Sequence, residues 1–200
     1  MKIRKIVVDA GHGGHDPGTI GRYSKEKDIA LKIALKFGKY IEENFPEIEV
    51  IYTRKTDVFV ELYKRAEIAN KNNADLFISI HCNGVRSSSP YGTETFVMGL
   101  DKSEANLEIA RKENAVILME DNYSERYEYN PNSPEAYIIF SLYQNAFLDQ
   151  SLKLASKVQD QFRERVKRND RGVKQAGFWV LYKTTMPGIL IETGFLSNPN

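Results

Sequence analysis

The stretch Lys5-Ile6-Val7-Val8-Asp9-Ala10-Gly11-His12-Gly13-Gly14 carries the strongest structural signal of this chain. Lys5–Ala10 is a short, largely apolar run of the kind that forms a buried strand. Residues 11–21 hold five glycines and one proline, which predicts a loop where that strand ends. Asp75–His81 is a second apolar run with strand character, and it closes on a histidine. We therefore expect two buried strands with a histidine at or just beyond the end of each.

Helical periodicity separates these two strands. A stripe of four apolar residues at 3.6-residue spacing predicts a helix over Lys25–Phe45, namely Ala30, Ala34, Phe37 and Ile41. Pro46 ends that helix. Further strands are expected over Glu47–Arg54, Thr93–Met98, Phe178–Tyr182 and Ile189–Glu192, and further helices over Glu61–Asn72, Ser103–Glu120 and Tyr143–Lys167. Residues 121–134 show no period and are expected to be irregular. Strands alternating with helices predict an α/β fold with a largely parallel central sheet flanked by helices.

Composition narrows the class of protein. The chain has 200 residues, of which 42% are hydrophobic and 28% charged, as is usual for one globular domain. No apolar stretch approaches the roughly 18 residues of a membrane helix. Lys and Arg nearly balance Asp and Glu, leaving a net charge of +1, which gives no overall electrostatic case for nucleic acid. The single cysteine, Cys82, cannot form an internal disulfide.

The N-terminal residues Met1–Val8 begin with basic side chains, but their apolar run is too short for a signal peptide. The chain therefore opens directly on its first strand. Two locations remain open from the sequence: a cytoplasmic protein, or an exported protein whose export segment is absent from this chain.

Three ionisable residues are expected at one edge of the sheet. Ligands of open α/β sheets bind beyond the carboxyl ends of the strands, where His12, His81 and Glu192 are placed. Each also has a simpler interpretation: a surface histidine for His12, a hydrogen-bonded core histidine for His81, and a salt-bridged carboxylate for Glu192. Glu26 begins the first helix, where the helix dipole alone would favour a carboxylate. Cys82 points to the opposite side of its strand from His81 and is expected to be a small buried hydrophobe.

Two histidines and one carboxylate that leave a fourth position open describe a catalytic zinc site. A second carboxylate that does not bind the metal would serve as the base. Four charged or polar residues lie near strand and helix ends and could orient Glu192 or meet substrate carboxylates, although solvated positions are favoured: Arg54, Arg65, Lys174 and Gln175.

Five blocks of sequence, in order, resemble the motifs of the zinc-dependent N-acetylmuramoyl-L-alanine amidases, the amidase-3 family. The blocks are Val7–Gly14, Lys25–Asp28, Ser79–Asn83, Asp170–Gln175 and Ile191–Asn198. The resemblance spans nearly the whole chain and implies one α/β domain, residues 1–200, around a mixed sheet. It also implies an insertion around residues 113–150, which in some relatives covers the zinc and is displaced by a protein activator. A plain surface excursion is the alternative for that segment.

The resemblance places the Zn²⁺ ligands on His12, Glu26 and His81 and the catalytic glutamate on Glu192, and it leaves His15 outside the ligand set. The implied reaction hydrolyses the amide bond between N-acetylmuramic acid and L-alanine of the peptidoglycan stem peptide. The implied location is periplasmic or cell-wall associated, with no membrane span and no nucleic-acid partner. A zinc peptidase cutting within the stem peptide and a non-catalytic peptidoglycan-binding module remain as alternatives.

Overall fold

A computed structural model describes residues 2–99, 103–127, 133 and 146–199. In chain order the strands are β1 (Lys5–Ala10), β2 (Glu49–Tyr52), β3 (Leu76–Asn83), β4 (Thr93–Met98), β5 (Asp170–Ala176) and β6 (Gly188–Phe195). The helices are α1 (Glu26–Asn44), α2 (Leu62–Lys71), α3 (Glu104–Asn114), the 3-10 helix η1 (Ala115–Met119), α4 (Tyr123–Arg126), α6 (Leu148–Glu164) and α7 (Trp179–Tyr182).

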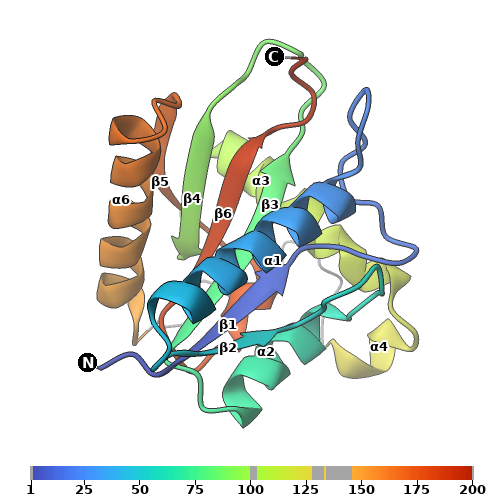
Figure 1. The fold of residues 1–200 in the computed structure, drawn as a ribbon. Coiled ribbons are helices and arrows are strands. Elements are labelled where there is room, and N and C mark those ends of the chain that lie inside the picture. The colour runs from blue at the N-terminus through green and yellow to red at the C-terminus, as the bar shows by residue number, and fades with distance from the viewer. Residues whose placement is uncertain (1, 100–102, 128–132, 134–145, 200) are drawn as a thin grey trace.

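The strands form one six-stranded sheet in the order β2-β1-β3-β6-β4-β5 (Figure 1). Neighbouring strands are parallel except for β4 and β6, which are antiparallel. The predicted α/β fold is therefore confirmed, and the sheet is mixed. β3 lies near the centre of the sheet and every one of its residues is buried, as expected of a strand covered on both faces.

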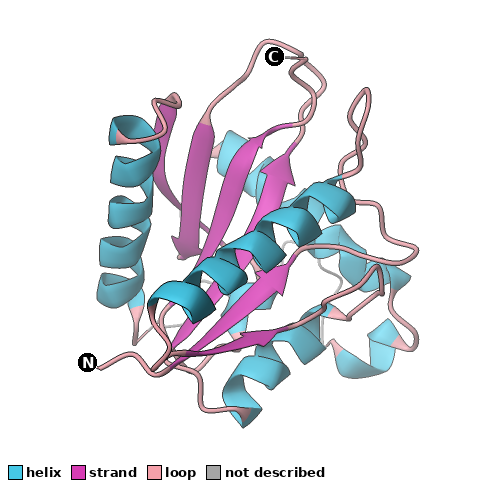
Figure 2. Cartoon of the chain, in the orientation of Figure 1, coloured by secondary structure: helices cyan, strands magenta, loops and turns pink. Residues whose placement is uncertain are grey.

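Helices cover both faces of the sheet (Figure 2). On one face, α1 covers β1 and β3 with Ala34 and Ile41, and α6, which contributes Ala155 to the same core, covers β4, β5 and β6. On the other face, α2, α3, η1 and α7 build a second core around Phe77 and Leu190. No helix in the described part of the chain has the length and apolar character needed to cross a membrane.

Two expectations about the C-terminal third are wrong. Phe178–Tyr182 is not a strand, because Trp179–Tyr182 forms the helical turn α7, and a short apolar run does not by itself distinguish a buried turn from a strand. The strand β5 was missed, because its sequence Asp170–Ala176 is polar and mostly half-buried at the sheet edge.

Smaller differences concern the middle of the chain. The helix expected over Ser103–Glu120 is α3 followed by the tighter η1. The helix expected over Tyr143–Lys167 is seen as α6, and its first expected residues, 143–145, lie outside the described residues. Within the expected irregular segment, Tyr123–Arg126 forms α4, and residues 128–132 and 134 lie outside the described part. Residues 128–132 and 134–145 of the expected insertion, 113–150, are likewise not described, and the insertion stays a prediction.

Candidate metal centre

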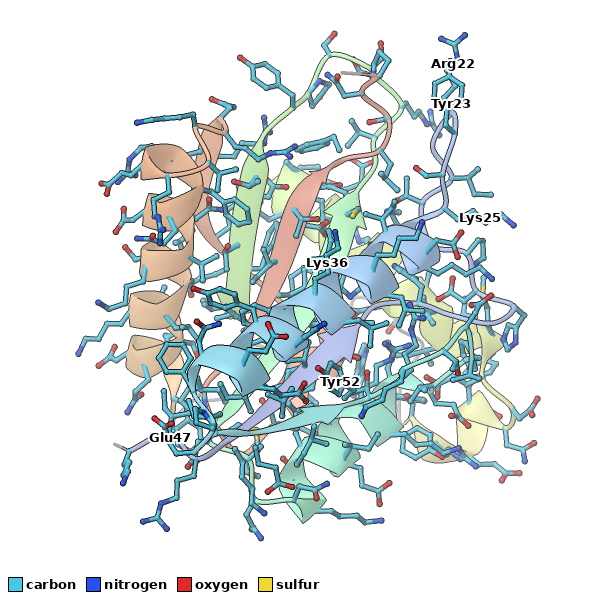
Figure 3. The ribbon with its side chains drawn as sticks, in the orientation of Figure 1. Arg22, Tyr23, Lys25, Lys36, Glu47 and Tyr52 are labelled. Carbon is cyan, nitrogen blue, oxygen red and sulfur yellow. The ribbon has the colours of Figure 1, made fainter. Side chains whose placement is uncertain are left out.

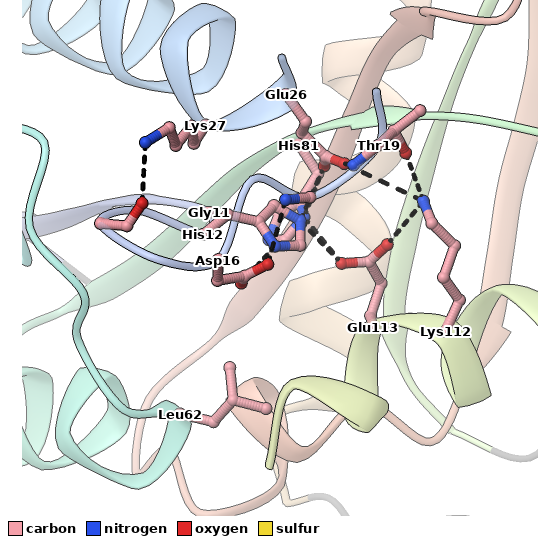
Figure 4. A network of polar contacts seen from close by, with 12 residues as sticks. Gly11, His12, Asp16, Thr19, Glu26, Lys27, Leu62, His81, Lys112 and Glu113 are labelled. Carbon is pink, nitrogen blue, oxygen red and sulfur yellow. Dashed lines mark hydrogen bonds and ion pairs between the residues drawn. The ribbon is translucent and has the colours of Figure 1, made fainter. Parts of the chain in front are cut away.

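Four buried side chains from separate parts of the chain converge on one point: His12, Glu26, His81 and Glu113. One ligand atom from each lies within 4.8 Å of the other three. Figure 4 shows Glu113 reaching the histidines from α3, while Glu26 approaches from the start of α1. The three residues that the sequence resemblance proposed as metal ligands are therefore brought together, and Glu113 joins them.

The distances within this cluster suit a tetrahedral cation. Nε2 of His12 lies 3.1 Å from Oε1 of Glu26 and 3.1 Å from Oε2 of Glu113. Nδ1 of His81 lies 3.1 Å from each of the same two oxygens. Zinc bonds of about 2.0–2.2 Å in a tetrahedron would place neighbouring ligands about 3.3–3.6 Å apart.

Two of these atoms lack hydrogen bonds although they are buried. Nε2 of His12 and Oε2 of Glu113 have no hydrogen-bond partner among the described residues, despite their closeness. Buried polar atoms are normally paired, so two unpaired atoms within the same cluster of potential ligands indicate a cation site. The chemistry and geometry of this donor set fit Zn²⁺.

The ring of His12 is oriented by Asp16. Nδ1 of His12 lies 2.7 Å from Oδ2 of Asp16, whose other oxygen accepts a hydrogen bond from the backbone N–H of Gly18. A carboxylate on one ring nitrogen fixes the tautomer and directs the other nitrogen toward a metal. Asp16 therefore positions Nε2 of His12 in the cluster.

Glycines give the ligands their space. A Cβ at Gly11 would lie 2.5 Å from the imidazole of His81. Gly18 has φ +63°, and a Cβ there would meet both His12 and Glu26 at less than 3 Å. Any larger residue at either position would displace a ligand, so the glycine-rich loop serves close packing around the ligands.

Glu26 is held from both sides. Its Oε2 accepts a hydrogen bond of 2.8 Å from the backbone N–H of Thr19, and its Oε1 accepts one of 3.0 Å from the backbone N–H of Cys82. Burial alone would raise the pKa of Glu26, but the neighbouring His12 lowers it below the ordinary range. Glu26 is therefore an ionised, fixed carboxylate.

Two buried arginines hold the backbone that carries His12, which has a left-handed φ of 59°. Arg65 donates to the carbonyls of Ala10 and His12 and pairs with Asp9 at 2.8 Å. Arg54 donates to the carbonyls of Ala10 and Gly11. The expectation of solvated positions is wrong for both arginines, because carbonyls beyond the end of β1 would otherwise be buried without donors.

Asp9 completes this support from inside the core. It accepts hydrogen bonds of 2.6 Å from Thr53 and from Ser79, in addition to the ion pair with Arg65. Burial acts to raise the pKa of Asp9, but Arg65 and the two hydroxyls outweigh it and the pKa is lowered.

Glu192 stands beside the cluster without joining it. It lies in β6 opposite His81 in β3, so both side chains share one face of the sheet. Glu192 is 1% exposed, and neither carboxylate oxygen has a hydrogen-bond partner among the described residues. Burial, followed by repulsion from Glu26 and Glu113, raises its pKa well above the ordinary value. The salt bridge considered as its alternative is absent from the described part of the structure, and the environment is that of a general base.

Glu113 and its neighbour Lys112 were missed by the sequence analysis. The ammonium group of Lys112 lies 3.3 Å from Oε1 of Glu113 and 3.9 Å from Oε2 of Glu26, and it donates to Oγ1 of Thr19. Glu113 follows Asn106 and Ala110 at helical spacing on the buried side of α3. The signal available in the sequence for Glu113 was a carboxylate at a helix position whose spacing predicts burial.

Neighbouring carboxylates favour the charged form of both histidines in the absence of a cation. Burial opposes the charged form of both rings, but Glu113 and Glu26 dominate, raising the pKa of His81 to about 9 and that of His12 well above its ordinary value. Burial raises the pKa of Cys82 to about 12, and its side chain is buried, as predicted for a small hydrophobe. The ring of His15 lies against that of Phe59, and His15 is not one of the four clustered residues.

The space beside the cluster is small. The adjoining cavity, lined in part by Asp9, His81 and Glu113, has a volume of about 10 Å³, which is room for about one water molecule. Four ligands with no open position are typical of a closed metal site, whereas a catalytic zinc keeps one position free. This conformation therefore leaves no place for a substrate.

The fold and the buried cluster together define a single α/β domain with a candidate metal centre. Residues 6–200 match the family model described as N-acetylmuramoyl-L-alanine amidase, and the chain belongs to this Amidase_3 family of peptidoglycan-cleaving enzymes.

Relatives and solved structures agree with the family. The chain is 34% identical over 200 residues to the N-acetylmuramoyl-L-alanine amidase AmiA of Escherichia coli K12, covering 98% of this chain and 67% of that protein. It is 34% identical to AmiC of Escherichia coli O6:H1, covering 96% of this chain and 46% of that protein.

Among solved structures, the N-acetylmuramoyl-L-alanine amidase from Clostridium difficile 630 is similar, with a TM-score of 0.70 and 29% identity, covering 98% of this chain and 82% of that one. The CwlD amidase from Clostridioides difficile, solved in complex with the GerS lipoprotein, has a TM-score of 0.68 and 29% identity, covering 98% and 84%.

Proposed function

We propose that this chain hydrolyses the amide bond between N-acetylmuramic acid and L-alanine of the stem peptide, using Zn²⁺ held by His12, Glu26 and His81 and using Glu192 as the catalytic base. The observation that carries the proposal is the joint placement of these four side chains, with the first three at ligand distances and Glu192 buried and unpaired beside them. The match to the amidase family over residues 6–200 supports the choice of bond.

When bound, Zn²⁺ supplies Lewis acidity and lowers the pKa of water at the site. Glu192, with its raised pKa, takes a proton from the attacking water and returns it to the departing alanine amine. Burial of Glu192 raises its affinity for the proton. Asp16, behind His12, keeps Nε2 facing the cluster throughout.

The described conformation is proposed to be a resting state closed by Glu113. Its carboxylate occupies the position that a catalytic site leaves to substrate and water. Withdrawal of α3 would open that position without disturbing His12, Glu26 or His81, which belong to other elements. A protein partner that displaces α3 would then act as an activator, and the solved complex of the similar CwlD amidase with a lipoprotein supports a partner of this kind.

The substrate also suggests where the protein acts. Peptidoglycan lies outside the cytoplasmic membrane, so we propose a periplasmic or cell-wall location for the native protein.

Product analysis tests the reaction. Purified protein loaded with zinc is incubated with peptidoglycan, and the soluble fragments are identified by mass spectrometry. An amidase releases intact stem peptides that begin with L-alanine, and the Glu192→Gln variant releases none. Fragments cut within the stem peptide would support the peptidase alternative, and binding without release would support the binding module.

A further inference from the structure

A row of polar side chains crosses the sheet beyond the candidate metal centre. His81 in β3 is paired with Glu192 in β6, and Glu192 is paired with Glu94 in β4. Paired residues in neighbouring strands point to the same face, so these three side chains follow one line across the sheet. β5 is the next strand, and its Lys174 lies opposite Phe96, on the same face as Glu94. The line therefore runs from the metal centre to the sheet edge.

Glu94 is buried at the far end of this line with more positive than negative charge around it. The ammonium of Lys174 lies 2.5 Å from Oε2 of Glu94, and Nε of Arg171 lies 3.1 Å from the same oxygen. Asn83 donates to Oε1 at 2.6 Å. The carboxylate of Glu94 is thus paired with two cationic side chains, and the three side chains together carry a net charge of +1.

Both cations remain accessible while their partner is not. The side chain of Arg171 is 34% exposed and that of Lys174 is 22% exposed, against 1% for Glu94. The bond from Arg171 to Glu94 uses Nε, so the terminal nitrogens of the guanidinium are not part of it. The guanidinium also lies over the ring of Phe195 at 4.9 Å, which limits its orientations.

A cavity of about 260 Å³ opens over this cation pair. Glu94, Arg171 and Lys174 line one side, and α3 lines the other through residues that include Glu108 and Lys112. Since Lys112 also contacts Glu113 and Glu26, the cavity adjoins the metal centre. Glu108 of α3 is thus a carboxylate of the chain itself that lines this cavity, and withdrawal of α3 would leave the cavity open.

We propose that Arg171 and Lys174 form a subsite for a free carboxylate on the stem peptide, one or two residues beyond the amide that is cut. This inference rests on the proposed amidase function. Two strand spacings of about 4.8 Å, together with the two-residue offset between Glu94 and Phe96, put Lys174 in β5 about 12 Å from Glu192 in β6. A peptide spans about 3.4 Å per residue, so its second residue and side chain reach this distance.

The role of Glu94 is to hold the two cations in place. A long cationic side chain loses much rotamer freedom when it binds a ligand, and a fixed partner reduces that cost. The buried carboxylate, fixed in turn by Asn83, therefore prepares Arg171 and Lys174 for a second carboxylate from the substrate.

Two synthetic N-acetylmuramoyl peptides test the subsite. They differ only in whether the second amino acid carries a free carboxylate or a carboxamide, and their C-termini are capped. Steady-state kinetics are measured with zinc-loaded Glu113→Ala protein, in which the site is expected to be open. We expect kcat/KM to favour the free acid by about 5–10-fold, chiefly through KM, as for a partly exposed charge pair.

Substitutions locate the preference. In the same background, Lys174→Gln and Arg171→Gln should each reduce the ratio toward 1, and Lys174→Arg should retain most of it. Lys157→Gln on α6 is the matched control and should keep the parental ratio. A parental ratio of 1, or a ratio unchanged in both glutamine variants, would overturn the subsite.

Binding separates this inference from the proposed function. Titration calorimetry of both peptides on the Glu192→Gln variant of the Glu113→Ala protein gives the same comparison without turnover. A preference for the free acid there supports the subsite even if hydrolysis is absent, whereas absent hydrolysis by protein with Glu192 intact contradicts the amidase function. Equal binding of both peptides contradicts the subsite alone.

Discussion

The two sides of the candidate metal centre are built differently. His12 and Glu26 are fixed by a dense set of buried hydrogen bonds, through Asp16 and through backbone amides. Glu113, which faces them, is carried by α3 and has an oxygen without a hydrogen bond at the cluster. Lys112 beside it has a side chain that is 37% exposed. One side of the site is thus fixed by the core of the fold, and the other is supplied by a helix at the surface.

This difference explains how one site can be both assembled and closed. A catalytic site needs ligands that do not move, which buried secondary contacts provide. Regulation needs an element that can leave, and α3, in which four of 11 residues are buried, has a smaller buried share than β3, in which every residue is buried.

Glu192→Gln should have the greatest effect on activity. Removing the base should lower kcat by about 10³–10⁴-fold, while zinc content measured by mass spectrometry stays at the parental value, because Glu192 is not among the ligands. Glu61→Gln, which removes a half-buried carboxylate paired with Lys64, serves as the control and should keep full activity. Loss of zinc along with activity would show that Glu192 is a ligand.

Arg65→Met should strongly destabilise the fixed side. It leaves Asp9 charged and unpaired in the core, which costs about 3–5 kcal/mol. Urea unfolding of the zinc-free protein measures this. Arg163→Met, which breaks exposed ion pairs on α6, should cost far less, because exposed ion pairs contribute little to stability. Equal losses in the two variants would contradict the supporting role of Arg65.

Asp16→Asn should weaken metal binding by about 10–100-fold, because the ring of His12 loses its orienting carboxylate. Competition with a chromogenic chelator measures the affinity, and Asp149→Asn on α6 is the control. An unchanged affinity would mean that His12 is oriented without Asp16.

Glu113→Ala should act in the opposite direction. Removing the closing ligand should raise kcat/KM of the isolated protein by about 10-fold or more, the equivalent of about 1.4 kcal/mol, with zinc still bound by three residues. Glu108→Ala, elsewhere on α3, keeps the closing ligand and should give a smaller change. A fall in activity would assign Glu113 a role in catalysis instead of closure.

The pH dependence of stability should distinguish the zinc-free from the zinc-loaded protein. In the zinc-free state the pKa of His81 is raised to about 9. The interaction of protonated His81 with the neighbouring carboxylates therefore stabilises the fold fully below about pH 6.5. This stabilisation is lost as the pH rises toward 9. The raised pKa of Glu192 acts in the same direction. The Tm of chelator-treated protein should fall between pH 6.5 and 9, by about 2–4 °C for each kcal/mol lost.

Zinc-loaded protein should not show this decline, since zinc replaces the protons on the histidines. Equal pH dependence in both forms would contradict the assignment of His81 as a ligand.

Much of the site could be predicted from sequence because its residues follow strands and begin a helix. His12, His81 and Glu192 lie at or next to the ends of apolar runs, and such runs predict buried strands. The carboxyl ends of parallel strands lie at one edge of a sheet, which brings the three residues together. The helix dipole by itself explained a carboxylate at Glu26, so the family motif was needed to identify this residue as a candidate ligand. Glu113 was not selected, because a glutamate between Lys112 and Asn114 resembles a solvated helix position.

The same logic applies to the fold. Central strands such as β3 can be predicted because their residues are continuously apolar. The polar edge strand β5 is stabilised by pairing with β4, and no local sequence pattern indicates that pairing. α7 shows the converse error, since its apolar residues serve a buried turn.

Anomalous diffraction at the zinc edge, on crystals of the zinc-loaded protein and of its Glu113→Ala variant, tests the proposed metal centre most directly. We expect one peak within about 2.0–2.2 Å of Nε2 of His12, Nδ1 of His81 and Oε1 of Glu26, bound also by Glu113 in the parent and lacking that ligand in the variant. A peak held by other residues, or no peak in either crystal, would contradict it.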